Sequence, residues 1–307
     1  MADIPGFPGD SIGRSEPTGR GLLSFQDFNR PRIRYGYVLL LLFLTTGAAI
    51  TIFPFVWMFF SALKDSNEVF RIPPTLLPRS WQWSNFVKGW GEINLVRYFS
   101  NTIKIMAGTW FMAIIMPSLA AYSLSKMRPA FGNVVLLGFM ATLMMPSQAY
   151  LIPRFLVLQK LPLIHVNLLD SYWALWLPAI VQPFNIMLLK NFFDRIPTEL
   201  IESARIDGAA ELRIFGQIVF PLSKPIIAVL SIFTINGVWN DFFWPMIVIS
   251  TQAKQPIMVA VQLFSKGTSS MNVVMAVLFM VSVPPLVVFL VFQRFIIGGM
   301  TLGSLKG

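Results

Sequence analysis

A short charged segment at residues 199–217 holds most of the side chains that could do chemistry. It mixes apolar residues with six charged ones, which are Glu199, Glu202, Arg205, Asp207, Glu211 and Arg213. Charged groups on a surface helix can form charge-assisted hydrogen bonds with a partner. The segment is too polar to span a membrane, so it predicts an amphipathic surface helix, with a helix packed only on lipid headgroups as the alternative. Thr198 is the predicted N-cap, and Gly208 permits a bend between two short helices.

An isolated acid in an apolar stretch is the second candidate site. Asp241 is the only charged residue in the run 225–253, and Trp239 and Asn240 precede it. An ionisable group at membrane depth costs a few kcal/mol, so it usually has a partner or faces water. We predict that Asn101, Trp239, Asn240 and Asp241 line a translocation pathway. Hydrogen bonding between helices is the alternative for these polar groups.

Several kinds of chemistry are excluded by residues that the sequence lacks. It has no cysteine and a single histidine, His165, so disulfides, thiolate sites and His-pair metal sites are excluded. It contains no phosphate-binding G-x-x-x-x-G-K-[ST], no H-E-x-x-H pair and no G-x-S-x-G elbow. We therefore predict no catalytic residue, metal or cofactor in this chain. The net charge of +10 comes from scattered bases, which indicates a membrane surface rather than nucleic acid.

Composition predicts an integral membrane protein built of helices. Of the 307 residues, 55% are hydrophobic and only 12% are charged. Six apolar runs are long enough to span a membrane, at 36–60, 105–125, 129–153, 171–189, 225–253 and 267–293. Each contains proline, which packed transmembrane helices tolerate as a kink. The predicted organisation is a cytoplasmic tail at 1–35, a six-span domain at 36–300 with a cytoplasmic loop at 190–224, and a cytoplasmic tail at 301–307.

Positive charge predicts the orientation. Arg30, Arg32 and Arg34 precede the first run, whereas Lys64 alone follows it closely, and Lys126 and Arg128 lie in the tight second connection. Cytoplasmic loops are enriched in such residues, so the N-terminus is predicted to be cytoplasmic. Because six spans return the chain to the same side, the C-terminus is predicted there too.

The spacing within the loop resembles a known motif. Glu202-Ser203-Ala204, three residues, Gly208, nine residues, then Ile218-x-Phe220-Pro221 is similar to the EAA motif of ABC-importer permeases, which reads EAA, three residues, G, nine residues, I-x-L-P. Ser203 and Phe220 depart from it but keep the size class or the apolar character. Further likeness lies at 191–200, 220–225, 239–242, 292–295 and 305–307. Over residues 36–307 the chain resembles carbohydrate-type permeases, close to the second permease subunit of maltose-like importers.

The resemblance implies a type I ABC-importer architecture with a cytoplasmic coupling helix in a bacterial or archaeal inner membrane. It implies four partners besides lipid: a second homologous permease, a dimer of ABC ATPases that bind ATP and Mg, and an external solute-binding protein. The implied ATPase-coupling residues are Glu202, Ser203, Ala204, Arg205, Asp207 and Gly208. Among them Glu202 is expected to pair with a base of the ATPase. The solvated face of a helix is the alternative for Arg205 and Asp207. The tail 301–307 is expected to reach between the ATPases, with a frayed terminus as the alternative.

The function expected from this resemblance is ATP-driven uptake of a sugar or oligosaccharide that the binding protein delivers. A polyol or a glycerol-phosphate-type solute is the first alternative. A secondary transporter is the second, although it would normally show repeat symmetry and several intramembrane ionisable groups. An intramembrane enzyme or a purely structural subunit would leave the motif spacing unexplained.

Overall fold

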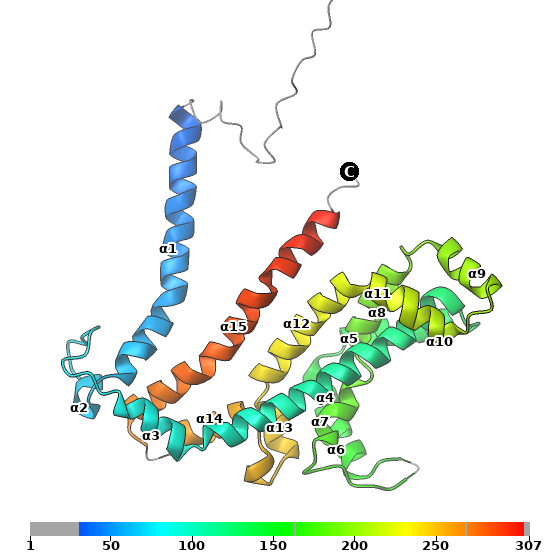
Figure 1. Cartoon of the computed structure of the whole chain (residues 1–307). Coiled ribbons are helices and arrows are strands. Elements are labelled where there is room, and N and C mark those ends of the chain that lie inside the picture. Colours follow the sequence, from blue (N-terminus) through cyan, green and yellow to red (C-terminus); the bar gives the residue numbers. More distant parts are fainter. Residues whose placement is uncertain (1–30, 163, 268, 304–307) are drawn as a thin grey trace, which may run out of the picture. The chain divides into compact units, whose positions relative to one another are not determined.

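The computed structural model describes residues 31–162, 164–267 and 269–303, and in those residues all regular structure is helical (Figure 1). The chain divides into two compact units, Met1–Val56 and Trp57–Gly307. Residues 1–30, most of the predicted N-terminal tail, lie outside the described part. The predicted helical fold class is therefore confirmed for the part of the chain that is described.

The first apolar run forms one long helix. α1 covers Pro31–Ala62 and contains Pro54 without ending there. Its stretch Ile33–Ala62 is 30 residues long and apolar enough to cross a membrane. Most of α1 belongs to the first unit, and its last turns from Trp57 belong to the second.

The second run forms the longest helix of the central part of the second unit. The short α2 (Ser66–Val69) and α3 (Ser84–Glu92) come first, and α4 (Leu95–Tyr122) then continues as one π-helical turn, Ser123–Met127. α4 packs along α8 and α12, which are described below. Because α4 passes from α3 to the region of α9 (Thr198–Ile206) and α10 (Glu211–Ile214), it connects the two ends of this unit (Figure 1).

Three of the predicted spans are broken rather than kinked. The third run gives α5 (Gly132–Met144) and α6 (Leu151–Gln159), whose axes are bent by 107°. The fourth gives α7 (Trp173–Trp176) and α8 (Pro183–Phe193), and the fifth gives α12 (Lys224–Asn240) and α13 (Phe243–Val248). Met145 and Gln182 are extended and directly precede proline, which disfavours helical backbone in the residue before it. The prediction that proline only kinks the helix of each run is wrong for these three.

The last run again forms one helix. α14 (Ile257–Ser265) precedes α15 (Met271–Gly303), which includes Pro284 and Pro285. Three helical stretches are long and apolar enough to span a membrane, Ile33–Ala62, Leu95–Met127 and Met271–Phe292, and the number rises to five if each bent pair is one span. The described residues thus support three to five spans by length and composition. Because α15 continues to Gly303, only residues 304–307 of the predicted C-terminal tail fall outside the described part.

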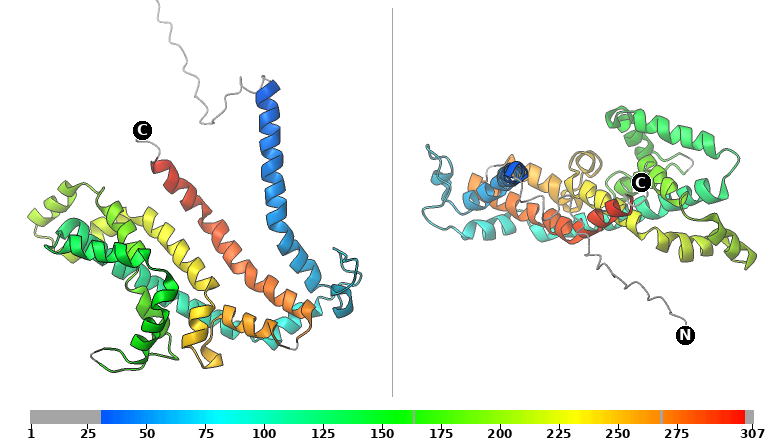
Figure 2. Two further views of the ribbon diagram at one scale, coloured as in Figure 1. Left: turned by 180° about the vertical axis from the view of Figure 1, so that it is seen from behind. Right: turned by 90° about the horizontal axis from the view of Figure 1, so that it is seen from above.

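Two buried clusters stabilise opposite ends of the second unit. One unites α4, α8, α9 and α10 and includes Ile114, Phe193, Ile201 and Ile214. The other unites α4, α14 and α15 and includes Leu95, Tyr98, Ile257 and Val277. Seen from behind in Figure 2, the same two ends remain far apart along α4. Each end holds one of the two candidate sites described below.

Candidate functional site

Two short helices joined by a glycine form the charged loop. α9 covers Thr198–Ile206 and α10 covers Glu211–Ile214. Gly208 lies between them with φ +78°, a left-handed conformation that residues with a Cβ rarely adopt. The predicted bend at Gly208 is confirmed. The predicted N-cap is wrong, because Pro197 occupies the cap position and Thr198 is already helical.

The apolar face of the loop is anchored in the core. Ile201 and Ile214 are fully buried, and they pack with Ile114, Leu189 and Phe193 of α4 and α8. The opposite face of α9 is exposed, including Glu202 and Arg205. This division follows from the amphipathic pattern of the sequence. The loop is therefore held at a fixed place on the helices that would cross the membrane.

A three-residue cluster, Tyr122, Arg205 and Glu211, ties α4, α9 and α10 together. Arg205 Nε donates to Glu211 Oε1 at 2.7 Å, and the Tyr122 hydroxyl donates to Glu211 Oε2 at 2.6 Å. These hydrogen bonds, first that from Arg205 and then that from Tyr122, lower the pKa of Glu211, and the bond to Glu211 raises the pKa of Arg205. Arg205, predicted to face a partner, is thus engaged within the chain. Sequence analysis did not select Glu211 as a site residue or link it to Tyr122.

Two of the other predicted coupling side chains, Glu202 and Asp207, face outward without a partner, whereas the Ser203 hydroxyl donates to the carbonyl of Leu200 at 3.2 Å. Glu202 and Asp207 are exposed, and neither forms a hydrogen bond through its side chain or an ion pair within the described residues. Beside them Ile206 is 85% exposed and Leu212 is 75% exposed. Between α9 and α10 lies a hollow of about 250 Å³ that Ala204, Asp207 and other loop residues line. Unpaired acids next to bare apolar side chains are typical of a surface that receives a protein partner.

The start of the loop is fixed by charges at the end of α8. Lys190 and Asp194 form an ion pair at 2.7 Å, and the Ser125 hydroxyl donates to the same carboxyl group at 2.7 Å. Burial alone would raise the pKa of Asp194, but these two hydrogen bonds outweigh it and the pKa lies below its usual value. Lys126 donates to the carbonyl of Ile196 at 2.7 Å. Lys126 of the second connection therefore also holds the start of the loop in place.

The predicted pathway residues form contacts within the chain. Asn101 is 4% exposed, donates to the carbonyls of Ala253 and Gln255 at 2.8 and 3.0 Å, and accepts from the Tyr172 hydroxyl at 2.9 Å. Trp239 is buried with its ring centroid 5.8 Å from that of Phe99. Such contacts match the alternative of bonding between helices, and a role in translocation stays a prediction.

The break in the fifth run explains the position of its acid. Asp241 has an extended backbone after α12, and its Oδ1 accepts from the backbone N–H of Trp244, in the first turn of α13, at 3.2 Å. Asn240 donates to Asn236 one turn earlier. Sequence analysis missed Arg154, whose guanidinium lies 4.0 Å from the centre of the Trp244 ring. Its position just after Pro153, at the edge of an apolar run, was the available signal.

Comparison with known families decides the class of protein. The family described as "Binding-protein-dependent transport system inner membrane component" matches residues 113–301. The chain belongs to this family. The predicted resemblance to ABC-importer permeases is confirmed, and membership excludes the secondary-transporter alternative. The permease is thus a transport component of an inner membrane rather than an enzyme.

Relatives of the permease match over most of their length. Protein LplC of Bacillus subtilis (strain 168) is 32% identical over 282 residues, which are 87% of this chain and 93% of that protein. The sn-glycerol-3-phosphate transport system permease protein UgpE of Escherichia coli O1:K1 / APEC is 32% identical over 285 residues, 89% and 97% of the two chains. The probable ABC transporter permease protein YurM of Bacillus subtilis (strain 168) is 30% identical over 297 residues, 96% and 97%.

A solved structure shows the same fold. A chain from the crystal structure of a bacterial ABC transporter involved in the import of the acidic polysaccharide alginate superposes with a TM-score of 0.76 at 23% identity, covering 86% of the permease and 98% of that chain. The type I ABC permease fold is therefore confirmed for this chain.

Proposed function

We propose that the permease is one of two homologous membrane subunits of an ABC importer for a sugar or oligosaccharide. A dimer of ABC ATPases binds ATP and Mg on the cytoplasmic side, and a solute-binding protein delivers the solute from outside. The resemblance of the loop and its flanks to carbohydrate-type permeases supports this solute class. Family membership supports the dependence on a binding protein. The lack of a G-x-x-x-x-G-K-[ST] motif in the sequence supports the proposal that the ATPase partners, and not this chain, bind the nucleotide and supply the energy.

One structural observation supports the coupling role most strongly. The loop is rigidly joined to α4 through Tyr122, Arg205 and Glu211, while Glu202 and Asp207 remain unpaired on its outer face. A partner that grips this outer face and moves would transmit its motion to α4, because buried apolar contacts and charge-assisted bonds join the two. In this proposal Glu202 binds a basic residue of the ATPase, and Ile206 packs against the ATPase surface. Ser203 and Ala204 place Glu202 on α9, and Gly208 sets the direction of the bend.

The proposed topology has six spans with both termini in the cytoplasm. The bent pair α5 and α6, the pair α7 and α8, and the broken fifth run each count as one span in this arrangement. Residues 1–35 form the N-terminal tail, residues 36–300 the permease domain, and residues 301–307 a tail that reaches between the ATPases. The three arginines around the start of α1, Arg30, Arg32 and Arg34, and the pair Lys126 and Arg128 support this orientation.

A second solute class is supported by the names of relatives. UgpE, 32% identical over 89% of this chain, is named as a permease for sn-glycerol 3-phosphate. A polyol or glycerol-phosphate-type solute is therefore the alternative. The two classes differ in charge, so transport assays that compare neutral sugars with glycerol 3-phosphate distinguish them.

The test is ATP hydrolysis by the complete complex in liposomes, with and without its binding protein, across a panel of solutes. Stimulation by a sugar-loaded binding protein is the expected result. Stimulation by glycerol 3-phosphate alone would establish the alternative. If no solute changed the rate of ATP hydrolysis, both proposed solute classes would be refuted. If the complex purified without an ATPase, the coupling role of the loop would be refuted.

A further inference from the structure

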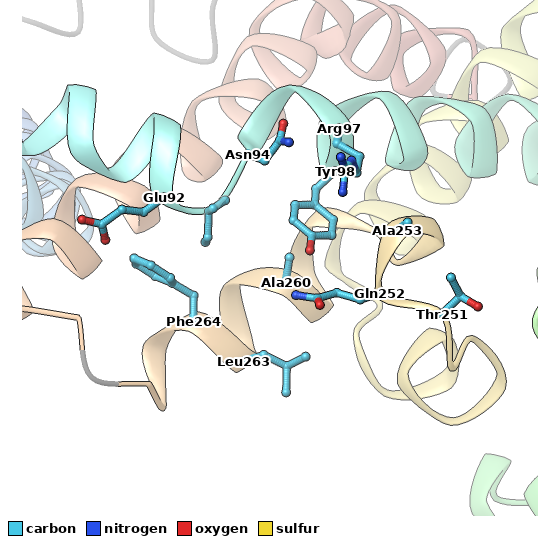
Figure 3. A pocket seen from close by; sticks show the side chains of 11 residues that line it. Glu92, Asn94, Arg97, Tyr98, Thr251, Gln252, Ala253, Ala260, Leu263 and Phe264 are labelled. Carbon is cyan, nitrogen blue, oxygen red and sulfur yellow. The ribbon is translucent and has the colours of Figure 1, made fainter.

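A polar cleft lies at the end of the second unit away from the charged loop. Its volume is about 640 Å³, within the range of small-molecule sites. The end of α3, the start of α4, the turn at 251–253 and α14 form its walls (Figure 3). Its lining residues were not selected from the sequence, because they come together only when α4 and α14 pack.

The turn that forms one wall is held from several sides. Asp170 accepts from the backbone N–H and the hydroxyl of Thr251 at 2.8 and 2.6 Å, and Lys254 pairs with it at 3.0 Å. The hydrogen bonds from Thr251 hold the pKa of Asp170 well below its usual value. Asn101 holds the carbonyl of Ala253 from α4. The wall is therefore preorganised, which lowers the entropic cost of binding a ligand.

Apart from Thr251, which bonds to Asp170, the polar side chains that line the cleft have no partner among the described residues. The side chains of Glu92, Asn94, Arg97 and Gln252 line it, and none forms a hydrogen bond or ion pair among the described residues. Tyr98 is only 5% exposed, yet its hydroxyl also lacks a partner in this part of the chain and reaches into the cleft (Figure 3). Buried tyrosine hydroxyls usually find a hydrogen-bond partner. Among the described residues the Tyr98 hydroxyl is not one of the fully buried polar atoms without a partner, so it is open to the cleft, where a ligand can supply that partner.

The side chains that line the cleft indicate which class of ligand it would bind. Within the described residues no group of three or more metal-ligating side chains occurs, which argues against a metal. One cation, Arg97, is balanced by one acid, Glu92, so the cleft has no net preference for an anion. Two amides and a phenol supply both donors and acceptors, and Phe264 supplies a flat apolar face. A neutral polyhydroxylated ring offers the matching hydroxyls and an apolar C–H face.

We propose that this cleft is an outer subsite of the permease that holds a neutral saccharide unit as it passes from the binding protein toward the spans. Tyr98, Arg97 and Gln252 bond its hydroxyls, and Phe264 packs against the ring. The inference rests on the proposed function, since it assumes a saccharide solute.

The experiment measures saccharide binding to the complete complex in nanodiscs without the binding protein. Maltose, raffinose, xylose and glycerol 3-phosphate are titrated by saturation-transfer NMR. Tyr98→Phe removes only the hydroxyl, so the affinity for the bound sugar is expected to fall about tenfold, and Arg97→Gln to fall similarly. Lys88→Gln, on exposed α3 surface outside the cleft, is the matched control and leaves the affinity unchanged. Equal melting temperatures without sugar show that the variants are folded.

The possible failures are distinguishable. If the wild-type complex transports a sugar with its binding protein but binds none alone, or if Tyr98→Phe binds as tightly as wild type, the subsite is refuted and the proposed function stands. If no sugar is transported, both are refuted. If glycerol 3-phosphate bound more tightly than the three sugars and Arg97→Gln abolished its binding, the proposal of a neutral ligand would be refuted. Weaker docking of the sugar-free binding protein to Arg97→Gln, with sugar affinity intact, would show that the cleft receives that protein instead.

Discussion

A glycine at position 208 can be required for its left-handed backbone or for the space that a side chain would fill. A series of substitutions at Gly208 tests which of these two requirements governs the loop. A Cβ built on Gly208 meets nothing within 4 Å, so the chain itself leaves room for a side chain. The cost of substitution comes from φ +78° alone. For an ordinary L-residue the left-handed conformation costs about 1–2 kcal/mol, whereas asparagine tolerates it better.

The expected order follows from that cost. Gly208→Ala should lower the free energy of unfolding of the loop by about 1–2 kcal/mol, Gly208→Val by more, and Gly208→Asn by less. Gly216→Ala is the matched control, because Gly216 also has open space around its Cβ position and no positive φ. That change should be neutral or slightly stabilising.

The assays are thermal unfolding of the complex and ATP hydrolysis stimulated by the loaded binding protein. Both should decline in the order Asn, Ala, Val, with Asn retaining most of the stimulation. If Asn abolished stimulation while Ala kept it, the size of the side chain would decide the outcome. The argument from backbone conformation would then be refuted, and close approach of a partner to Gly208 would replace it.

Three further predictions concern the remaining contacts of the loop and the outer turn. Glu202→Gln should abolish solute-stimulated hydrolysis while Glu199→Gln on the same helix keeps it, measured in liposomes, and equal loss in both would contradict the specific role of Glu202. The pKa of Glu211 is lowered in the folded state, so its bonds stabilise the loop at pH values above the ordinary pKa of about 4.5. This stabilisation is lost as the pH falls through the lower pKa of the folded state. Because the pair of Arg205 and Glu211 is partly exposed, it should contribute at most about 1 kcal/mol. Glu211→Gln should remove this part of the acid dependence of the melting temperature, and an unchanged pH profile would refute it. Asn101→Leu leaves the carbonyls of Ala253 and Gln255 without this donor, the second of them buried, and should destabilise the complex by about 1–3 kcal/mol in thermal unfolding, whereas a neutral result would contradict its structural role.

The apolar runs predicted where helices lie but not where they break. Pro54 and Pro117 remain inside α1 and α4, while the backbone becomes extended before Pro146 and Pro183. All four are prolines in apolar sequence, so composition does not distinguish them. What differs is whether neighbouring helices compensate for the lost hydrogen bond, and this depends on packing between segments far apart in the chain.

The charged loop shows a similar division. Its amphipathic face and its bend at Gly208 follow from local pattern and could be predicted. The bond between Tyr122 and Glu211 could not, because it joins residues 89 positions apart. Arg205 and Glu202 look alike in sequence as exposed charges on α9, and only the turn after Gly208 brings Glu211 to Arg205. The role of each charge therefore depends on the geometry of the turn.

α4 links the two candidate sites through a single element. Its 28 residues span about 42 Å, with Tyr98 in the outer cleft near one end and Tyr122 bonded to the loop at the other. If occupancy of the cleft favours one position of this helix, thermodynamic reciprocity requires that a partner gripping the loop alter the affinity of the cleft by the same factor. A bound saccharide would then be released by the same displacement that the ATPases impose, without a separate gate to open the site.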